Sequence, residues 1–160
     1  MRITGYKHSE DLARMMEIND SCYSGIYCPP RNIMVDNLLV SDVFAAREMM
    51  YEDNSASGLW DKELGEKIIG FAIVRDQEHV PAYIWNIAVD PEFQGRGVGS
   101  SLLREIIKKY TLAKSLGISL HVNVENAAQK LYFDYGFRVT SYVKDYFKPD
   151  DGLYMLRKLP

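Results

Sequence analysis

Three glycines within five positions, Gly95, Gly97 and Gly99, stand between an apolar stretch at Ile84–Val89 and a helical pattern of leucine and isoleucine. Pro91 ends the apolar stretch, because proline has no N–H with which to continue a strand. The pattern therefore predicts a strand, a glycine-rich turn and a helix. The free N–H groups and the positive dipole end of a helix attract anions, and glycine lets a phosphate approach the backbone. We expect a pyrophosphate site, and a tight turn without a ligand is the alternative.

The spacing of the turn excludes two nucleotide-binding motifs. The Rossmann fingerprint requires G-x-G-x-x-G, and the P-loop requires a Lys-Ser or Lys-Thr pair after its last glycine. The turn has neither. Its sequence from Gln94 to Gly99, Q-x-x-G-x-G, resembles the acetyl-coenzyme-A signature of the GNAT superfamily of N-acetyltransferases. The stretch from Asn86 to Pro91 is similar to that of N-terminal acetyltransferases of the ribosomal-protein-alanine type.

A second stretch, from Asn126 to Phe137, resembles the N-x-x-A-x-x-L-Y-x-x-x-G-F helix of the same superfamily. Leu131 and Tyr132 are in register with that pattern, whereas Asn126 stands one residue late and Glu125 occupies the family position. The resemblance implies that the Tyr132 hydroxyl lies near the coenzyme sulfur and protonates the departing thiolate. A phenol suits this role because its pKa of about 10 lies just above that of a thiol, about 8.5. Packing on an amphipathic helix is the alternative interpretation.

His121 alternates with Leu120 and Val122, which predicts a strand with the histidine on the opposite face. Its usual pKa of about 6.5 suits a general base that takes a proton from an attacking amine. Related eukaryotic N-terminal acetyltransferases are similar at this position. A polar residue on a half-buried strand is the alternative. His8 and His79 fall in predicted loops, and we expect both at the surface.

The resemblance also implies which residues hold each substrate. The backbone of Ile87–Val89 would polarise the thioester carbonyl and pair with the pantetheine arm of acetyl-CoA. The expected coenzyme-binding residues are Ile87, Ala88, Val89, Gln94, Gly95, Arg96, Gly97, Val98, Gly99, Ser100, Asn126 and Tyr132. Asn86, Tyr27 and Tyr146 are expected on the acceptor side, with Tyr146 in a hairpin that covers the substrate.

These motifs require a scaffold of the order β-α-α-β-β-β-α-β-α-β-β. This is the GNAT arrangement, and it predicts one α/β (α+β) domain over residues 1–160 with a mixed sheet of about seven strands. Strands are expected at 2–6, 67–75, 80–89, 119–124, 137–147 and 153–159. Helices are expected from the Ser9 cap to about Asn19, at 33–40, at 99–115 with Gly117 as C-cap, and at 127–135. The stretch 43–51 suits a helix by propensity and a strand by length, and the resemblance favours a strand. A long loop is expected at 53–66.

The composition limits the remaining possibilities. A hydrophobic content of 47% and a charged content of 26% are typical of a soluble globular domain. The net charge of −3 argues against general nucleic-acid binding and weakly favours a cationic substrate. No apolar run is long enough to span a membrane, and the N-terminus lacks a signal-peptide pattern, so we expect a cytoplasmic protein. Cys22 and Cys28 match no zinc spacing, and we expect two ordinary thiols and no metal.

The sequence thus predicts an acetyl-CoA-dependent N-acetyltransferase. Neither cysteine lies near a motif, which favours direct attack of the amine over a covalent enzyme intermediate. An α-amino group, with a pKa of about 8, loses a proton more easily than a lysine at about 10.4, so the expected acceptor is a protein N-terminus. A small amine, such as a polyamine or an amino-sugar, is the alternative. A non-catalytic domain that binds acetyl-CoA as a regulatory ligand is a third possibility.

Overall fold

The computed structural model describes residues 1–7, 11–23, 29, 31–51 and 63–160. Its elements are β1 (Arg2–Gly5), α1 (Asp11–Cys22), α2 (Arg31–Leu39), β2 (Asp42–Tyr51), β3 (Glu63–Arg75), β4 (Ala82–Val89), η2 (Pro91–Phe93), α3 (Val98–Leu112), β5 (Gly117–Asn123), α4 (Gln129–Asp134), β6 (Arg138–Phe147) and β7 (Asp150–Lys158). This is the predicted order, with the short 3-10 helix η2 added.

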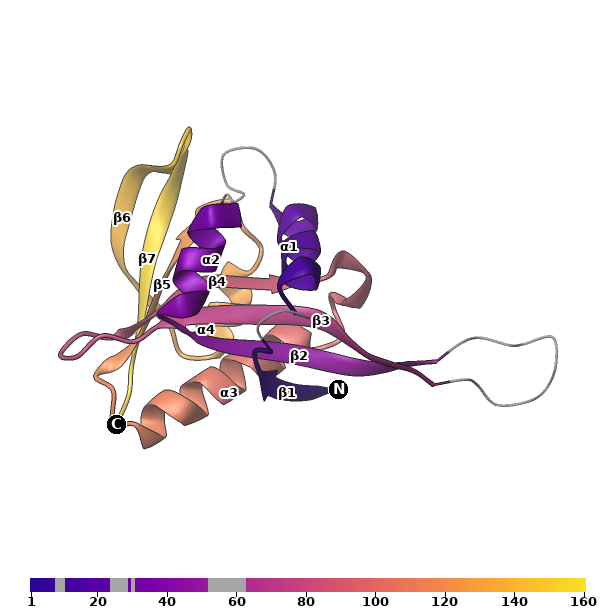
Figure 1. Cartoon of the computed structure of the whole chain (residues 1–160). Helices are drawn as coiled ribbons and strands as arrows, with labels where there is room; N and C mark the ends of the chain where they lie inside the picture. Colours follow the sequence, from indigo (N-terminus) through magenta and orange to yellow (C-terminus); the bar gives the residue numbers. More distant parts are fainter. Residues whose placement is uncertain (8–10, 24–28, 30, 52–62) are drawn as a thin grey trace.

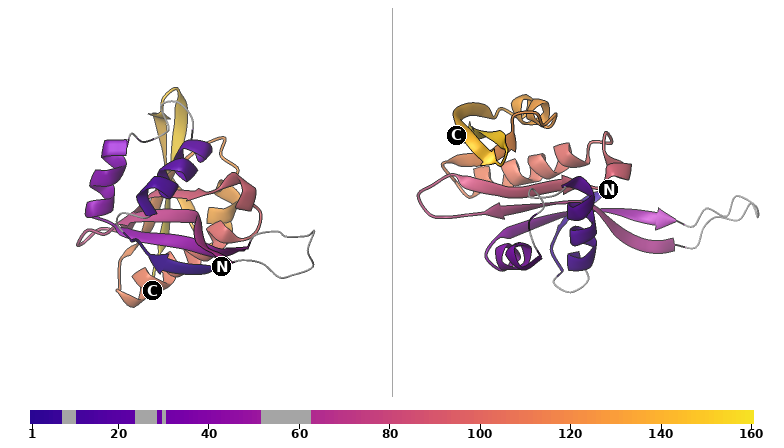
Figure 2. Two further views of the ribbon diagram at one scale, coloured as in Figure 1. Left: turned by 45° about the vertical axis from the view of Figure 1, so that its right-hand side comes forward. Right: turned by 90° about the horizontal axis from the view of Figure 1, so that it is seen from above.

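The strands of the described chain form one seven-stranded sheet in the order β1-β2-β3-β4-β5-β7-β6. The β4–β5 pair is parallel, and the other neighbours are antiparallel. Helices α1 and α2 cover one face of the sheet, and α3 and α4 cover the other (Figures 1 and 2). Both faces of β3 are therefore buried: Phe71 and Ile73 pack with α1 and α2, while Ala72 and Val74 pack with α3.

Several boundaries differ from the prediction. Strand β3 begins at Glu63, inside the expected loop, and β7 begins at Asp150 rather than at residue 153. Helix α3 ends at Leu112, because Lys114 takes a left-handed φ of 56° and the Ser115 N–H bonds back to the Tyr110 carbonyl at 3.0 Å. The expectation that Gly117 is the C-cap is wrong: Gly117 begins β5, where a Cβ would lie 2.7 Å from the Arg157 carbonyl oxygen.

The ambiguous stretch before the first long loop is a strand, as expected. Strand β2 pairs with β1 on one side and β3 on the other. Because β2 pairs with a strand on each edge, it forms a strand although its sequence has a high helical propensity. No helix in the described part of the chain is both long and apolar enough to cross a membrane.

Two irregularities of β4 open the centre of the sheet. Strands β4 and β5 pair only where Ala82–Ile84 meets Ile118–Leu120, and beyond this point they separate. The register between β3 and β4 also skips Trp85, which is the extra residue of a β-bulge. The part of β4 from Asn86 to Val89 therefore has no strand on its β5 side within the described chain. That free edge faces the site described next.

Candidate active site

The glycine-rich turn is held in place at Asp90. One carboxylate oxygen of Asp90 accepts the Glu92 N–H at 3.0 Å, and the other is hydrogen-bonded to Arg14 of α1. Phe93, at the end of η2, is buried. The turn is thus fixed to α1, which lies on the face of the sheet opposite α3.

Glycine is required at two positions of this turn. Gly95 and Gly97 have φ angles of 73° and 81°, which are costly for residues with a Cβ. A Cβ at either position would meet no atom within 4 Å, so backbone conformation rather than crowding demands glycine. Helix α3 begins directly afterwards, and its first-turn N–H groups lie at the dipole end that attracts anions.

A cavity of about 580 Å³ lies against this turn, and we call it the turn cavity. All the predicted coenzyme-binding residues line it except Arg96. The Arg96 guanidinium lies instead over the Phe93 ring, with 4.9 Å between its carbon and the ring centroid. The arrangement has the shape and the backbone donors that a pyrophosphate with an extended arm requires.

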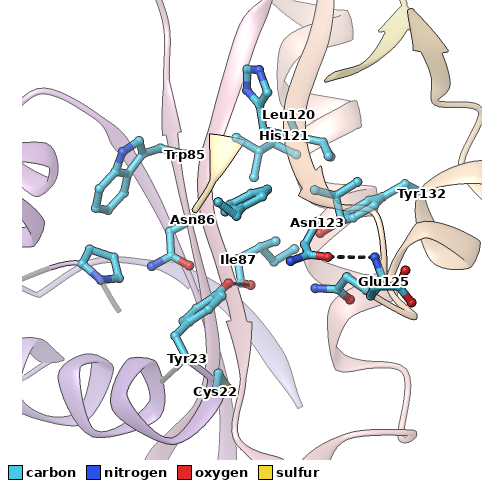
Figure 3. A pocket seen from close by; sticks show the side chains of 15 residues that line it. Cys22, Tyr23, Trp85, Asn86, Ile87, Leu120, His121, Asn123, Glu125 and Tyr132 are labelled. Carbon is cyan, nitrogen blue, oxygen red and sulfur yellow. Dashed lines mark hydrogen bonds between the residues drawn. The ribbon is translucent and has the colours of Figure 1, made fainter. Parts of the chain in front are cut away.

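A second cavity, of about 410 Å³, lies between the separated halves of β4 and β5, and we call it the cleft cavity (Figure 3). The two cavities share five lining residues, namely Cys22, Tyr23, Ile87, Asn126 and Tyr132. They therefore meet at the free edge of β4, opposite α4. Ligands in the two cavities would meet at this junction.

Tyr132 lies at the junction of the two cavities. Its side chain comes from α4 and faces β4 across the cleft (Figure 3). The ring packs edge to face against Phe137, with 5.9 Å between the centroids. Burial raises the pKa of the Tyr132 hydroxyl to about 12, so this group is protonated at neutral pH and can donate a hydrogen bond. No residue in the described ranges hydrogen-bonds this hydroxyl, which leaves it available to a ligand.

His121 lines the cleft cavity within a cluster of tyrosines. Its Nδ1 lies 3.0 Å from the Tyr83 hydroxyl, and its ring stacks on Tyr146 with 4.0 Å between the centroids. The Tyr83 and Tyr146 hydroxyls are 3.3 Å apart, and Tyr154 packs on the same histidine. Burial lowers the pKa of the His121 imidazole below its usual value of 6.5. The histidine is therefore neutral near pH 7 and can accept a proton.

The three acceptor-side residues of the sequence analysis have different places. Asn86 lines the cleft cavity and is buried. Tyr146 contacts the site through His121 and Tyr83, while its neighbour Phe147 lines the cavity wall. Tyr27, like His8 and Cys28, lies outside the described residues. His79 is exposed in the β3–β4 turn, as expected.

The sequence analysis missed the end of α1. The Cys22 thiol donates to the Val89 carbonyl at 3.1 Å, and the Tyr23 hydroxyl donates to the Ile87 carbonyl at 2.9 Å. The expectation that neither cysteine lies near a motif is thus wrong for Cys22, which helix packing brings to the glycine-turn strand. These bonds also show that Ile87 and Val89 present their backbone polar groups to the cavities, because the N–H and C=O of one strand residue point the same way.

The charge of the cleft cavity is low. Glu125 is the one Asp, Glu, Lys or Arg side chain among the described residues that line it. Asn126, the displaced residue of the second motif, accepts the Ala128 N–H at 2.8 Å and so shapes the turn before α4. In the described part of the chain, no three His, Cys, Asp or Glu side chains are grouped as a metal site requires. The site can thus hold a largely neutral or singly charged acceptor.

Comparisons with known proteins agree with this geometry. The family model described as "Acetyltransferase (GNAT) domain" matches residues 55–139. The [ribosomal protein bS18]-alanine N-acetyltransferase of Haemophilus ducreyi is 35% identical over 88 residues, which are 54% of this chain and 60% of that protein. The chain spans less than two thirds of the length of the first curated relatives it matches.

Solved structures share the fold along nearly the whole chain. The ribosomal-protein-S18-alanine N-acetyltransferase from Escherichia coli superposes with a TM-score of 0.78 at 21% identity, over 99% of this chain and 93% of that one. A GNAT family acetyltransferase from Elizabethkingia anophelis, crystallised with acetyl-CoA bound, superposes with a TM-score of 0.71 at 20% identity, over 99% and 97% of the two chains. The family match covers more than half of the 160 residues, and the chain belongs to the GNAT acetyltransferase family.

Proposed function

We propose that the protein is an acetyl-CoA-dependent N-acetyltransferase whose acceptor is the α-amino group of a protein N-terminus. The observation that supports it most is the meeting of two cavities at Tyr132 and the free edge of β4. One cavity suits the pyrophosphate and pantetheine of acetyl-CoA, and the other suits an amine. The relative that acetylates an alanine of a ribosomal protein supports the choice of a protein acceptor.

The turn cavity fits the coenzyme on grounds of its own geometry. The glycine turn and the first turn of α3 offer backbone donors for the pyrophosphate. The N–H groups of Ile87 and Val89, with the second lone pair of the Ile87 carbonyl, offer strand-like pairing to the pantetheine amides. Bound there, acetyl-CoA supplies a thioester carbonyl and a thiol leaving group. The backbone N–H groups of β4 polarise the carbonyl, and the Tyr132 hydroxyl donates a hydrogen bond to the sulfur.

His121 is the base in this proposal. When its Nδ1–H donates to the Tyr83 oxygen, Nε2 keeps a lone pair that can take the amine proton. Figure 3 shows the His121 ring at the edge of the cleft cavity, apart from Tyr132, so a water molecule carries the proton between the amine and the ring. Burial raises the pKa of the Tyr83 hydroxyl, and this keeps the group protonated beside the histidine.

The pKa of the amine itself favours an α-amine over a lysine or a polyamine, whatever base takes the proton. A proton moving from an α-ammonium at about 8 to an imidazole below about 6.5 climbs at least about 1.5 pKa units, or about 2 kcal/mol. From a lysine or polyamine ammonium near 10.4 the climb is about 4 units, or about 5 kcal/mol. Among the described residues that line the cleft, Glu125 is the single carboxylate, and this offers a polycation few partners.

Direct attack on the thioester remains the favoured route although Cys22 lies close to it. Burial raises the pKa of the Cys22 thiol, so little of the nucleophilic thiolate exists at neutral pH. The thiol proton is also engaged with the Val89 carbonyl. A covalent acetyl-cysteine would need both of these features to change first.

The test is turnover of defined amines. The purified chain is incubated with acetyl-CoA and with peptides that begin with Ala, Ser, Gly or Met, and the released thiol and the product mass are measured. The matched control for each peptide is the same sequence with a blocked N-terminus, alongside spermidine and glucosamine. We expect acetylation of a free α-amine and none of the blocked peptide. Turnover of spermidine without turnover of any peptide would refute the proposal that the acceptor is a protein N-terminus. Coenzyme binding without turnover of any amine would refute the proposal that the protein is an acetyltransferase.

A further inference from the structure

Asn86 carries a buried polar atom for which the described part of the chain offers no hydrogen-bond partner. Its Nδ2 donates to Oδ1 of Asn19 on α1 at 2.9 Å, and this bond fixes the orientation of the carboxamide. Its Oδ1 is buried and accepts no hydrogen bond from any residue in the described ranges. The side chain is only 6% exposed, and it lines the cleft cavity. Buried acceptors are rarely left unpaired in native proteins, so this oxygen needs a functional explanation.

The position of Asn86 restricts what could supply the missing donor. The residue follows the Trp85 bulge and precedes Ile87, which lines both cavities. Asn86 itself lines the cleft cavity and is not part of the turn cavity. The residue thus lies on the acceptor side of the junction, one position before Ile87, which lines both cavities. An amine that attacks a carbonyl must come within about 3.5 Å of it, so the attacking nitrogen lies close to this junction.

We propose that Asn86 positions the attacking amine, with Oδ1 accepting one of its N–H groups; this inference rests on the proposed function. A neutral primary amine has two N–H groups and one lone pair. One N–H given to Asn86 directs the lone pair away from Asn86 and toward the other cavity. A hydroxyl acceptor would have a single hydrogen, which the base must take, so the arrangement selects nitrogen over oxygen.

The neutrality of the carboxamide is part of the proposal. A carboxylate at this position would hold an ammonium ion strongly and raise its pKa, which would hinder loss of the proton. An amide oxygen accepts the same hydrogen bond at much smaller cost to deprotonation. This division leaves the proton to His121 and gives Asn86 the placement of the nitrogen alone.

The first variant removes the acceptor atom. Asn86→Leu has a similar volume, and we expect it to lower kcat/KM for the best peptide by about tenfold or more, as loss of a buried hydrogen bond does. The KM for acetyl-CoA should not change, because Asn86 does not line the turn cavity. The control is Asn37→Leu, the same replacement at a buried asparagine that lines neither cavity. It reports the general cost of losing a buried carboxamide, and thermal unfolding of both variants shows whether they fold.

The second variant, Asn86→Asp, keeps the shape and gives a readout that packing alone would not move. The carboxylate should raise the pKa of the bound amine, so the acid limb of the kcat profile should move to higher pH by about one unit or more. Wild-type amine kinetics in Asn86→Leu, or an unshifted acid limb in Asn86→Asp, would overturn the inference while leaving the proposed function intact. A wild-type protein that acetylates no amine would refute the proposed function itself, and the role of Asn86 would be refuted with it.

Discussion

Replacement of Tyr132 by phenylalanine tests whether the tyrosine acts on the leaving group. The change removes one oxygen from a buried side chain at the meeting point of the two cavities. Burial raises the pKa of this hydroxyl to about 12, about 3.5 units above that of a free thiol at about 8.5. Complete transfer of the proton to such a thiolate would cost about 5 kcal/mol. Tyr132 therefore acts mainly as a hydrogen-bond donor to the developing charge, which refines the role of proton donor expected from the motif.

The size of the effect follows from this role. A hydrogen bond to a charged group contributes about 1.5 to 3 kcal/mol, so Tyr132→Phe should lower kcat between about tenfold and about 150-fold. The KM for acetyl-CoA should change little, since the interaction strengthens only as the sulfur becomes negative. The released thiol is followed under saturating substrates.

Tyr135→Phe is the matched control for this substitution. Tyr135 follows α4 directly and lines neither cavity, so its loss of a hydroxyl should leave kcat unchanged. The melting temperature of Tyr132→Phe should stay near that of the wild type, because its hydroxyl bonds no residue of the described chain. A variant that keeps more than half of the wild-type kcat, or that loses only coenzyme affinity, would refute the reasoning.

Three further substitutions test other parts of the site. Because burial lowers the pKa of His121, its contribution to stability is present above about pH 6.5 and is lost as the pH falls through the lowered value. Between about pH 7.5 and about pH 5, the melting temperature of His121→Gln should therefore drop less than that of the wild type. The kcat of this variant should be lower than that of the wild type at every pH. Equal drops in melting temperature in the wild type and in His121→Gln would contradict the lowered pKa of His121. Gly97→Ala forces a φ of 81° on a residue with a Cβ, so it should cost about 1 to 2 kcal/mol and lower the melting temperature by several degrees, measured by thermal unfolding, with Gly5→Ala as control. In Gly152→Ala the new Cβ would lie 2.9 Å from the Tyr146 Cβ, so we expect the stack on His121 to loosen and the KM for the peptide to rise; an unchanged KM would show that Tyr146 does not shape the acceptor side.

Local motifs predicted residues that the structure brings together around the turn cavity. The glycine spacing, the strand before it and the helix after it are adjacent in the chain, so sequence alone places them together. All the predicted residues of this group line the turn cavity except Arg96, whose side chain finds the Phe93 ring instead. The alternation of Leu120 and Val122 likewise predicted the face on which His121 lies, because a strand has a period of two residues.

The acceptor side depends on contacts between distant segments, and sequence reasoning found less of it. The Tyr83 hydroxyl reaches His121 only because β4 and β5 pair in one register, which no local pattern reveals. Cys22 and Tyr23 reach the free edge of β4 because α1 continues past its expected end at about Asn19. The C-cap predicted at Gly117 failed for a similar reason, since close approach to the Arg157 backbone, and not helix termination, requires that glycine.

The bulge at Trp85 connects the two halves of the site. Ile84 faces α3, and Trp85 and Asn86 both face α1, before Ile87 returns to the α3 side. A regular strand of the same sequence would turn Asn86 toward α3 and Ile87 toward α1, because a slip of one residue reverses every side chain. Asn86 would then lose Asn19 as a partner. The extra residue is therefore what lets one strand offer its backbone edge to the coenzyme and a side-chain oxygen to the amine.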